Sequence, residues 1–245
     1  MNETRFHTLP GGTRIAFRKT GGRGPALVFL PGYMSDMGGS KAAVVFDWAT
    51  QQGRACLLLD YSGCGESEGA FAERTLSRWR DEVLALIAAE CDDKVVLIGS
   101  SMGGWLMLLV ALAIPARVAA LVGIAAAPDF TDWGYTADQK AALAVGETVY
   151  EDNPYGPEPT PTYPALWADG QANRVLNGGL TLSCPVRLLH GQADSDVPWE
   201  TSLQLAAALR SADVQVTLVK DGDHRLSRPC DIALLLAALA ALDPE

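Results

Sequence analysis

A candidate nucleophile lies in residues 99–103, which read GSSMG and fit the pattern G-x-S-x-G. In this pattern a strained turn between a strand and a helix exposes the serine oxygen, and the glycines let the two elements approach closely. Ser101 has a glycine two positions away on both sides, whereas Ser100 has Ile98 and Met102 at those positions. We therefore expect Ser101 to attack an electrophilic carbon, at a helix N-terminus whose N–H groups can stabilise an oxyanion.

A serine hydroxyl needs a general base, and the chain has three histidines that could provide it. His7 falls in a predicted N-terminal hairpin, far from the edge of the sheet where Ser101 should lie. His190 ends a predicted strand, where its expected role is structural, holding the loop that follows. His224 follows the last predicted strand and should reach Ser101, so we predict that His224 is the base. The alternative is that His224 is an ordinary surface histidine.

Such a base is oriented by a carboxylate that also stabilises its cationic form. The loop after residue 190 contains Asp194 and Asp196. We predict that Asp194 is the triad acid and that Asp196 is a loop or helix-capping residue, with the reverse assignment as the alternative. Asp223 adjoins His224, which makes pairing of the two side chains difficult, so we expect Asp223 to be solvated. The chain order Ser, Asp, His is the order found in α/β-hydrolases.

Stabilisation of an oxyanion takes two N–H donors. The N–H of Met102, directly after the candidate nucleophile, is one of them. The other should come from the loop after the apolar run 26–30, which reads PGY at residues 31–33, and we assign it to Tyr33. Many α/β-hydrolases have His-Gly in this loop where this chain has Pro-Gly. Because the donor belongs to the backbone, that change is compatible with the role.

Buried strands that alternate with helices must position these residues. Continuous apolar runs are typical of strands covered on both faces of a parallel sheet, and they occur at 26–30, 55–60, 94–99, 118–125 and 185–190. A further strand is expected at 214–219, and helices are expected at 40–52, 75–90, 102–113, 199–210 and from about 229, the first two capped by Ser40 and Thr75. Segments 5–9 and 13–19, joined by PGG, predict an antiparallel hairpin. The pattern predicts a single α/β domain over residues 1–245, with a mostly parallel, doubly wound sheet.

Residues 129–183 interrupt this alternation. They show no clear strand and are rich in proline and aromatic residues, and a structureless loop of that length is improbable in a compact domain. Because the segment follows a strand whose carboxyl end should border the ligand site, we predict an inserted helical lid. Trp133, Tyr135 and Trp167 are the expected substrate-binding residues. The alternatives are a decorative insertion, or side chains that only pack the lid onto the core.

The composition of the chain argues against several classes of binding partner. The formal net charge is −10, with 19 Lys+Arg against 29 Asp+Glu, which argues against nucleic acid and against electrostatic docking to an anionic membrane. Five scattered cysteines without CxxC spacing indicate free thiols rather than a zinc site or a disulfide framework. No secretory signal or transit peptide is visible, and the apolar stretch 232–242 is too short to span a bilayer. We predict a cytoplasmic protein without stable membrane anchoring, metal or other cofactor.

Several blocks of the sequence resemble a single family. They are PGYMSDMGGSKA at 31–42, DYSGCGESEG at 60–69, GSSMGGWLML at 99–108, CPVRLLHG at 184–191 and DHR at 223–225. Together they are similar to the abhydrolase subgroup that contains a mitochondrial acyl-protein (palmitoyl) thioesterase, which also hydrolyses drug acyl-glucuronides. The resemblance implies the α/β-hydrolase fold and maps the triad onto Ser101, Asp194 and His224. The lid matches poorly, and the lack of a transit peptide suggests a bacterial relative.

We therefore predict a serine hydrolase that cleaves acyl thioesters or carboxylic esters through an acyl-serine intermediate. Its substrate would be a small molecule or an S-acylated protein. The nearest alternative is a general carboxylesterase or lipase-like hydrolase of small esters, which would use the same residues. A non-catalytic binding protein of the same fold is the alternative from another class, and the complete set of three catalytic residue types argues against it.

Overall fold

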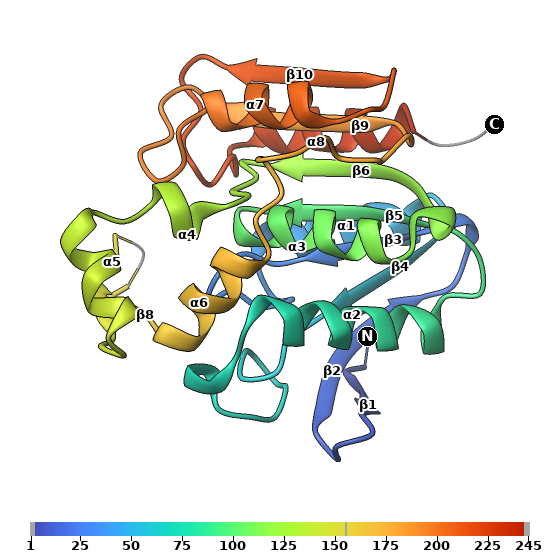
Figure 1. The fold of residues 1–245 in the computed structure, drawn as a ribbon. Helices are drawn as coiled ribbons and strands as arrows, with labels where there is room; N and C mark the ends of the chain where they lie inside the picture. The colour runs from blue at the N-terminus through green and yellow to red at the C-terminus, as the bar shows by residue number, and fades with distance from the viewer. Residues whose placement is uncertain (1–2, 155, 243–245) are drawn as a thin grey trace.

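The computed structural model describes residues 3–154 and 156–242, and its centre is an eight-stranded sheet in the order β1-β2-β4-β3-β5-β6-β9-β10 (Figure 1). Neighbouring strands from β4 to β10 are parallel, whereas β1 pairs with β2 and β2 with β4 in antiparallel fashion. The predicted parallel sheet with an N-terminal hairpin is therefore present. The strands are β1 Arg5–Thr8, β2 Arg14–Thr20, β3 Arg23–Leu30, β4 Arg54–Leu59, β5 Val95–Ser100, β6 Val118–Ile124, β9 Val186–Gly191 and β10 Val214–Val219.

The central strands are apolar throughout because helices cover both of their faces. Every residue of β5 is buried. Its alternate side chains enter two separate layers of the core, Leu97 on one face of the sheet and Val96 on the other. Since successive side chains of a strand point to opposite faces, a strand between two helical layers needs an unbroken apolar run.

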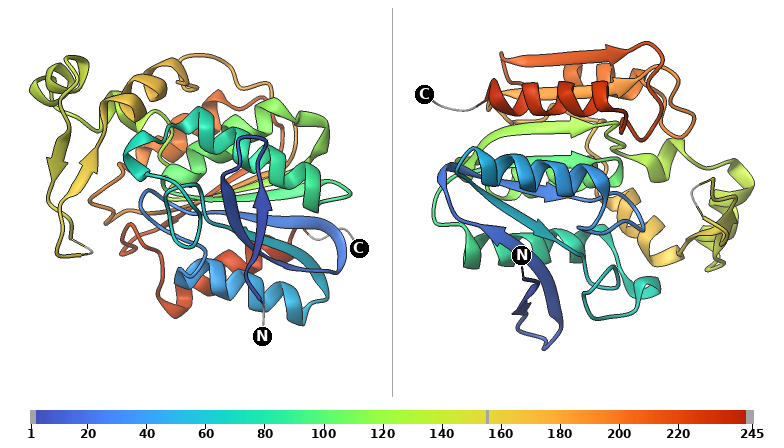
Figure 2. Two further views of the ribbon diagram at one scale, coloured as in Figure 1. Left: turned by 90° about the horizontal axis from the view of Figure 1, so that it is seen from below. Right: turned by 180° about the vertical axis from the view of Figure 1, so that it is seen from behind.

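Two groups of helices form these layers (Figure 2). One face carries α2 Leu76–Glu90, α3 Met102–Ala113 and α7 Glu200–Ala208, and the other carries α1 Ser40–Gln51 and α8 Pro229–Ala240. Short 3-10 turns, η1 Phe71–Glu73 and η2 Pro115–Arg117, precede α2 and β6. The Thr75 hydroxyl accepts a hydrogen bond from the Arg78 N–H at 3.2 Å, as expected of a cap. At α1 the cap is Gly39, and the predicted cap Ser40 is the first helical residue.

The insertion between β6 and β9 contains three helices and a small hairpin. Its elements are α4 Phe130–Trp133, α5 Ala137–Ala144, β7 Val149–Glu151, β8 Thr160–Thr162 and α6 Pro164–Ala172. The antiparallel β7–β8 pair corrects the expectation that the segment holds no strand. Each strand has three residues, and Pro161 removes one backbone donor from β8, so neither leaves an alternating apolar signal.

Two buried or half-buried carboxylates hold the base and the last helix of the insertion in place. Asp129, which has a left-handed backbone (φ 60°), accepts hydrogen bonds from the N–H groups of Val175 at 2.8 Å and Leu176 at 2.9 Å. Asp169 on α6 accepts bonds from the N–H and hydroxyl groups of Ser77 at the start of α2, at 2.8 and 2.7 Å. Asp129 therefore joins the beginning of the insertion to its end, and Asp169 ties α6 to α2, while the middle of the insertion projects from the body of the molecule (Figure 2).

All five cysteines are free thiols. Within residues 3–154 and 156–242, no helix is long and apolar enough to cross a membrane. The same part of the chain contains no cluster of three or more His, Cys, Asp or Glu side chains that could hold a metal ion.

Candidate active site

Ser101 forms the turn that joins β5 to α3 and has a strained backbone. Its φ of 54° and ψ of −122° lie in a region that residues other than glycine rarely occupy. Hydrogen bonds hold the turn in place: the Ser101 N–H donates to the Ile124 carbonyl at 2.9 Å, and the Ser101 carbonyl accepts from the N–H groups of Gly104 at 2.8 Å and Ala127 at 3.0 Å. The strain is thus supported by β6 and by the loop that follows it, and the side chain of Ser101 faces the cavity at the top of the sheet.

The glycines around Ser101 are required by close backbone contacts. A Cβ added to Gly99 would collide with the carbonyl oxygen of Gly103, and one added to Gly103 would collide with the carbonyl oxygen of Leu30. The first contact is between β5 and α3, and the second is between α3 and the end of β3. Small residues at these two positions let the helix start directly beside the strands, which explains the spacing of the motif.

The structure brings Ser101, His224 and Asp194 together in one chain of hydrogen bonds. The Nε2 atom of His224 lies 3.1 Å from Ser101 Oγ, and its Nδ1 atom lies 2.8 Å from Asp194 Oδ2. The Asp194 side chain is fully buried and that of His224 is 14% exposed. Because the carboxylate accepts a hydrogen bond from the Nδ1–H group, Nε2 is left without a hydrogen and can accept the proton of the serine hydroxyl.

Asp194 is held as an anion by four donors. Its Oδ1 accepts the N–H groups of Asp196 and Val197, both at 2.9 Å, and its Oδ2 faces His224 at 2.8 Å and His190 at 3.1 Å. Burial alone would raise the pKa of Asp194, but the hydrogen bonds from His190, His224 and the Val197 N–H outweigh it and hold that pKa well below its usual range. The carboxylate is therefore ionised at neutral pH.

The other candidate residues lie apart from this chain. The carboxylate of Asp196 accepts a hydrogen bond from the Ser195 hydroxyl at 3.0 Å, and only its backbone N–H contacts Asp194. Asp223 is exposed and its Oδ1 accepts the N–H of Leu226 at 2.9 Å. His7 lies in β1, at the edge of the sheet farthest from β10.

His190 was expected to fix the loop after β9, and it does more than that. Its ring contacts Asp194 itself, which the sequence analysis did not foresee. The spacing of four residues between His190 and Asp194 was the available signal. This spacing alone does not predict the contact, because the direction of the His190 side chain depends on the packing of α7 against β9.

The predicted donors of an oxyanion hole lie on two segments that meet at Ser101. Met102 is the first residue of α3, so its N–H has no acceptor within the helix. The loop after β3 passes beside the serine, since a Cβ added to Gly32 would lie 3.4 Å from Ser101 Cβ. Tyr33 follows Gly32 in that loop, and both Tyr33 and Met102 line the cavity at Ser101.

The Tyr33 side chain connects this loop to the insertion. Its hydroxyl donates to the carbonyl oxygen of Pro161 in β8 at 2.7 Å. Its ring packs against Phe71 and Phe130, with centroids 5.1 and 6.4 Å away. Burial, with Tyr135 and another tyrosine nearby, raises the pKa of Tyr33 far above its usual range, so the hydroxyl remains a donor. This contact was not anticipated, because it joins residues 128 positions apart.

A cavity of about 730 Å³ lies over Ser101 and His224, between the carboxyl edge of the sheet and the insertion. Phe130, Trp133 and Tyr135 form part of its wall on the insertion side. The Trp133 indole N–H donates to the Pro128 carbonyl at 2.8 Å, and the Tyr135 hydroxyl lies 2.7 Å from Thr162 Oγ1, so the positions of both rings are fixed.

Unlike Trp133 and Tyr135, Trp167 is not among the described residues that line this cavity. Its indole N–H donates to the Thr131 carbonyl at 3.1 Å, within the insertion. Trp167 begins the second turn of α6, which contacts α4 and α5. The ring therefore packs the helices of the insertion together. The sequence shows that an aromatic residue is present there, but not the face of α6 on which it lies.

The rim of the cavity carries charges of both signs. Burial and the nearby Arg225 lower the pKa of Lys41, whose amine donates to the Arg225 carbonyl at 2.5 Å. Acidic residues outnumber basic ones around the cavity. The acidic residues are Asp36, Glu151, Asp152 and Asp196, and the basic residues are Lys41 and Arg225.

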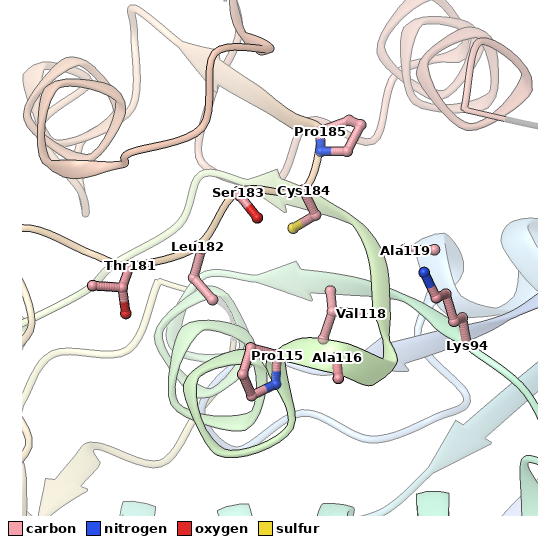
Figure 3. A pocket seen from close by; sticks show the side chains of 10 residues that line it. All are labelled: Lys94, Pro115, Ala116, Val118, Ala119, Thr181, Leu182, Ser183, Cys184 and Pro185. Atoms are coloured by element: carbon pink, nitrogen blue, oxygen red, sulfur yellow. The ribbon is translucent and has the colours of Figure 1, made fainter.

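A second cavity, of about 330 Å³, lies at the opposite edge of the sheet (Figure 3). It is lined by residues that precede β5, β6 and β9, including Lys94, Pro115 and Cys184. Ligands of parallel α/β sheets bind outside the carboxyl ends of the strands, and this cavity lies at their amino ends. The larger cavity, over Ser101 and His224, is therefore the candidate active site.

Comparison with known proteins places this geometry in context. Residues 25–154 match a family model described as the alpha/beta hydrolase fold. The human mitochondrial palmitoyl-protein thioesterase ABHD10 is 36% identical over 240 residues, covering 94% of this chain and 77% of its own. A putative hydrolase from Agrobacterium vitis S4 superposes with a TM-score of 0.92 at 40% identity, covering 99% of both chains. Mouse ABHD10 superposes with a TM-score of 0.91 at 35% identity, covering 98% of both.

Proposed function

The chain belongs to the alpha/beta hydrolase family, and from that premise we propose that it is a serine hydrolase that cleaves acyl thioesters or carboxylic esters. The observation that carries the proposal is the hydrogen-bonded chain from Ser101 through His224 to Asp194, beside a cavity large enough for a substrate. An activated serine next to a base that is itself oriented by a carboxylate is the arrangement that nucleophilic acyl transfer requires.

In the proposed reaction Ser101 Oγ attacks the acyl carbonyl carbon while its proton passes to His224 Nε2. The carbonyl oxygen becomes an oxyanion, which the N–H groups of Tyr33 and Met102 stabilise. The carbon–sulfur or carbon–oxygen bond to the leaving group then breaks, and His224 returns the proton to the departing thiol or alcohol. A water molecule, deprotonated by His224, then attacks the acyl carbon; the bond to Ser101 Oγ breaks, His224 returns the proton to Oγ, and the carboxylic acid leaves. Asp194 remains ionised throughout and stabilises the imidazolium.

The acyl group of the proposed substrate is of medium to long chain length. Phe130, Trp133 and Tyr135 provide apolar surface beside Ser101, and two relatives that match most of this chain are named palmitoyl-protein thioesterases. A small neutral thioester or an S-acylated protein fits the acidic rim. A general carboxylesterase or lipase-like hydrolase of small esters is the second candidate, since the same three residues would serve it.

We propose that residues 1–245 form a single domain in which the segment of about 129–183 acts as a lid. The support is its position over the cavity, the closure of its base through Asp129 and the attachment of α6 to α2 through Asp169, with the hairpin between them bonded to the loop after β3 through Tyr33. For location we propose the cytoplasm on the basis of composition, although the similar thioesterases are named as mitochondrial.

The test is a series of acyl thioesters and p-nitrophenyl esters that runs from acetyl to palmitoyl. Each methylene that is buried contributes about 0.8 kcal/mol, so kcat/KM should rise with chain length until the cavity is full. The Ser101→Ala variant is the control for hydrolysis elsewhere on the protein. If acetyl is preferred and kcat/KM falls steadily as the chain grows, the general carboxylesterase is the better description.

A further inference from the structure

Two imidazole rings converge on one oxygen atom of Asp194. His190, at the end of β9, is fully buried, and its Nε2 lies 3.1 Å from Asp194 Oδ2, the same atom that His224 Nδ1 contacts at 2.8 Å. The Nε2 of His190 is also 3.1 Å from the Val197 carbonyl oxygen. On its other side, His190 Nδ1 lies 2.7 Å from the hydroxyl oxygen of Ser202, a buried residue of α7.

These contacts determine where the hydrogen of the His190 ring lies. The two groups that face Nε2, a carboxylate and a carbonyl oxygen, accept hydrogen bonds and cannot donate them, so Nε2 carries the hydrogen. In the neutral ring, Nδ1 has no hydrogen, and the Ser202 hydroxyl is then the donor to it. A neutral ring in this tautomer satisfies all three neighbours, and the single charge of Asp194 remains available to His224.

We infer that His190 is a positioning residue that acts on the base His224 through Asp194, an inference that rests on the proposed hydrolase function. A hydrogen bond donated to a carboxylate stabilises its negative charge and weakens its attraction for a further proton. His190 donates to Oδ2 of Asp194 and so reduces the negative charge that faces His224. Asp194 can then orient the His224 ring while attracting a second proton to that ring less strongly. We therefore expect kcat/KM to reach its plateau at a lower pH with this hydrogen bond than without it.

The described contacts of the other charged side chains around His224 go to partners other than Asp194. Asp223 and Arg225 flank His224 on its own loop, Lys41 reaches that loop from α1, and Asp231 of α8 is paired with Arg228. On the β9–α7 loop, Asp196 turns its carboxylate to Ser195. The described hydrogen bonds of the two His224 ring nitrogens go to Ser101 and Asp194. His190 therefore has the most direct route to the base, through a shared oxygen.

A purely structural role for His190 would have a different signature. Loss of packing alone would lower stability, and would lower kcat/KM by the same factor at every pH. Loss of the hydrogen bond to Asp194 should instead shift the pH profile of kcat/KM in one direction. The carboxylate becomes more basic, the proton on His224 is held more tightly, and the rising limb of the kcat/KM profile moves to higher pH.

Three substitutions separate these roles. The amide nitrogen of Gln can occupy the place of Nε2 and donate to Asp194, whereas that of Asn lies nearer the place of Nδ1, and Leu donates at neither. We expect the rising limb in His190→Asn and His190→Leu to lie about half a pH unit above that of the wild type, which is about a threefold loss of kcat/KM on the acidic side. His190→Gln should stay close to the wild type. Thermal unfolding of each variant shows whether it is folded.

An unchanged limb in folded His190→Asn overturns the inference. Failure of the proposed function would look different, because then the wild type itself would neither hydrolyse the esters nor react with a fluorophosphonate. In that event proton NMR still tests His190, through the downfield signal of the His224 Nδ1–H in the bond to Asp194. The His190→Asn substitution should strengthen that bond and move the signal further downfield, and an identical signal in both proteins would refute the role.

Discussion

At the scale of single residues, the backbone of Ser101 separates it from its neighbour Ser100. Ser101 has a left-handed backbone (φ 54°) at the turn, and its hydroxyl lies 3.1 Å from His224. Ser100 is the last residue of β5 and is 9% exposed. The two adjacent hydroxyls therefore differ in their access to a base, and only that of Ser101 has the geometry of a nucleophile.

We expect Ser101→Ala to lower kcat by a factor on the order of 10⁶, because the acyl-enzyme can no longer form. Ser100→Ala is the matched control and should have a far smaller effect. Mass spectrometry of protein labelled with a fluorophosphonate identifies the modified residue. Label on Ser100, or full activity in Ser101→Ala, would contradict the assignment.

The sequence was sufficient to predict which residues meet at the candidate site where a local pattern or the chain order indicates them. The G-x-S-x-G spacing located Ser101, and elimination among three histidines led to His224, which the structure brings beside it. It was insufficient where a role depends on the side chain's direction. Trp167 packs within the insertion and His190 reaches Asp194, and both facts depend on how a helix lies against its neighbours.

At the scale of elements, predictability followed the strength of the apolar pattern. The strands β3, β5 and β6 are buried on both faces, so each contains a continuous apolar run that predicts a buried strand. The pair β7–β8 has strands of three residues and includes Pro161, and it therefore gives no such signal. The insertion is held together by contacts between residues far apart in sequence, such as Tyr33 with Pro161, and local propensity carries no information about those.

The contact of Tyr33 with Pro161 predicts a link between the insertion and the loop after β3. Tyr33→Phe keeps the backbone N–H and the ring but removes the hydrogen bond to β8, so the hairpin loses one anchor on the cavity wall. Since one hydrogen bond contributes about 1 kcal/mol, we expect kcat/KM for palmitoyl substrates to fall roughly fivefold, with a smaller change for acetyl substrates. Steady-state kinetics on both substrates measure the ratio.

Tyr150→Phe is the matched control for that substitution, because Tyr150 lies on β7 of the same hairpin and is 65% exposed. It should leave both rates unchanged. An equal loss for acetyl and palmitoyl substrates in Tyr33→Phe would show that the hydroxyl acts on the oxyanion loop and not on the acyl site.

At the scale of the whole molecule, the parallel sheet gathers the proposed catalytic groups. Ser101 follows β5, Asp194 follows β9 and His224 follows β10, and in the sheet these strands occur in the order β5-β6-β9-β10. Parallel strands end at the same edge, so three loops that are distant in sequence meet above it. The insertion follows β6 and lies beyond the same edge of the sheet (Figure 1), where Phe130, Trp133 and Tyr135 line the cavity.

The charge of the whole protein should also influence the choice of leaving group. The formal net charge is −10, and four acidic residues against two basic ones line the cavity. A strongly anionic leaving group such as coenzyme A therefore approaches a repulsive field, whereas a neutral thiol does not. At low ionic strength that field extends about 30 Å from the surface, and at physiological salt it extends about 8 Å.

We therefore expect acyl-coenzyme A to be a poorer substrate at low salt than a neutral thioester with the same acyl chain, by roughly tenfold. The difference in kcat/KM between the two substrates should decrease as salt is added, while kcat/KM for the neutral thioester stays nearly constant. Removing two rim charges in Glu151→Gln/Asp152→Asn should raise the low-salt rate with acyl-coenzyme A and leave the neutral substrate unaffected. Steady-state kinetics over a range of salt concentrations measure both effects. If salt instead slows the reaction with acyl-coenzyme A, then Lys41 and Arg225 attract the leaving group, and the local charge at the cavity outweighs the net charge of the protein.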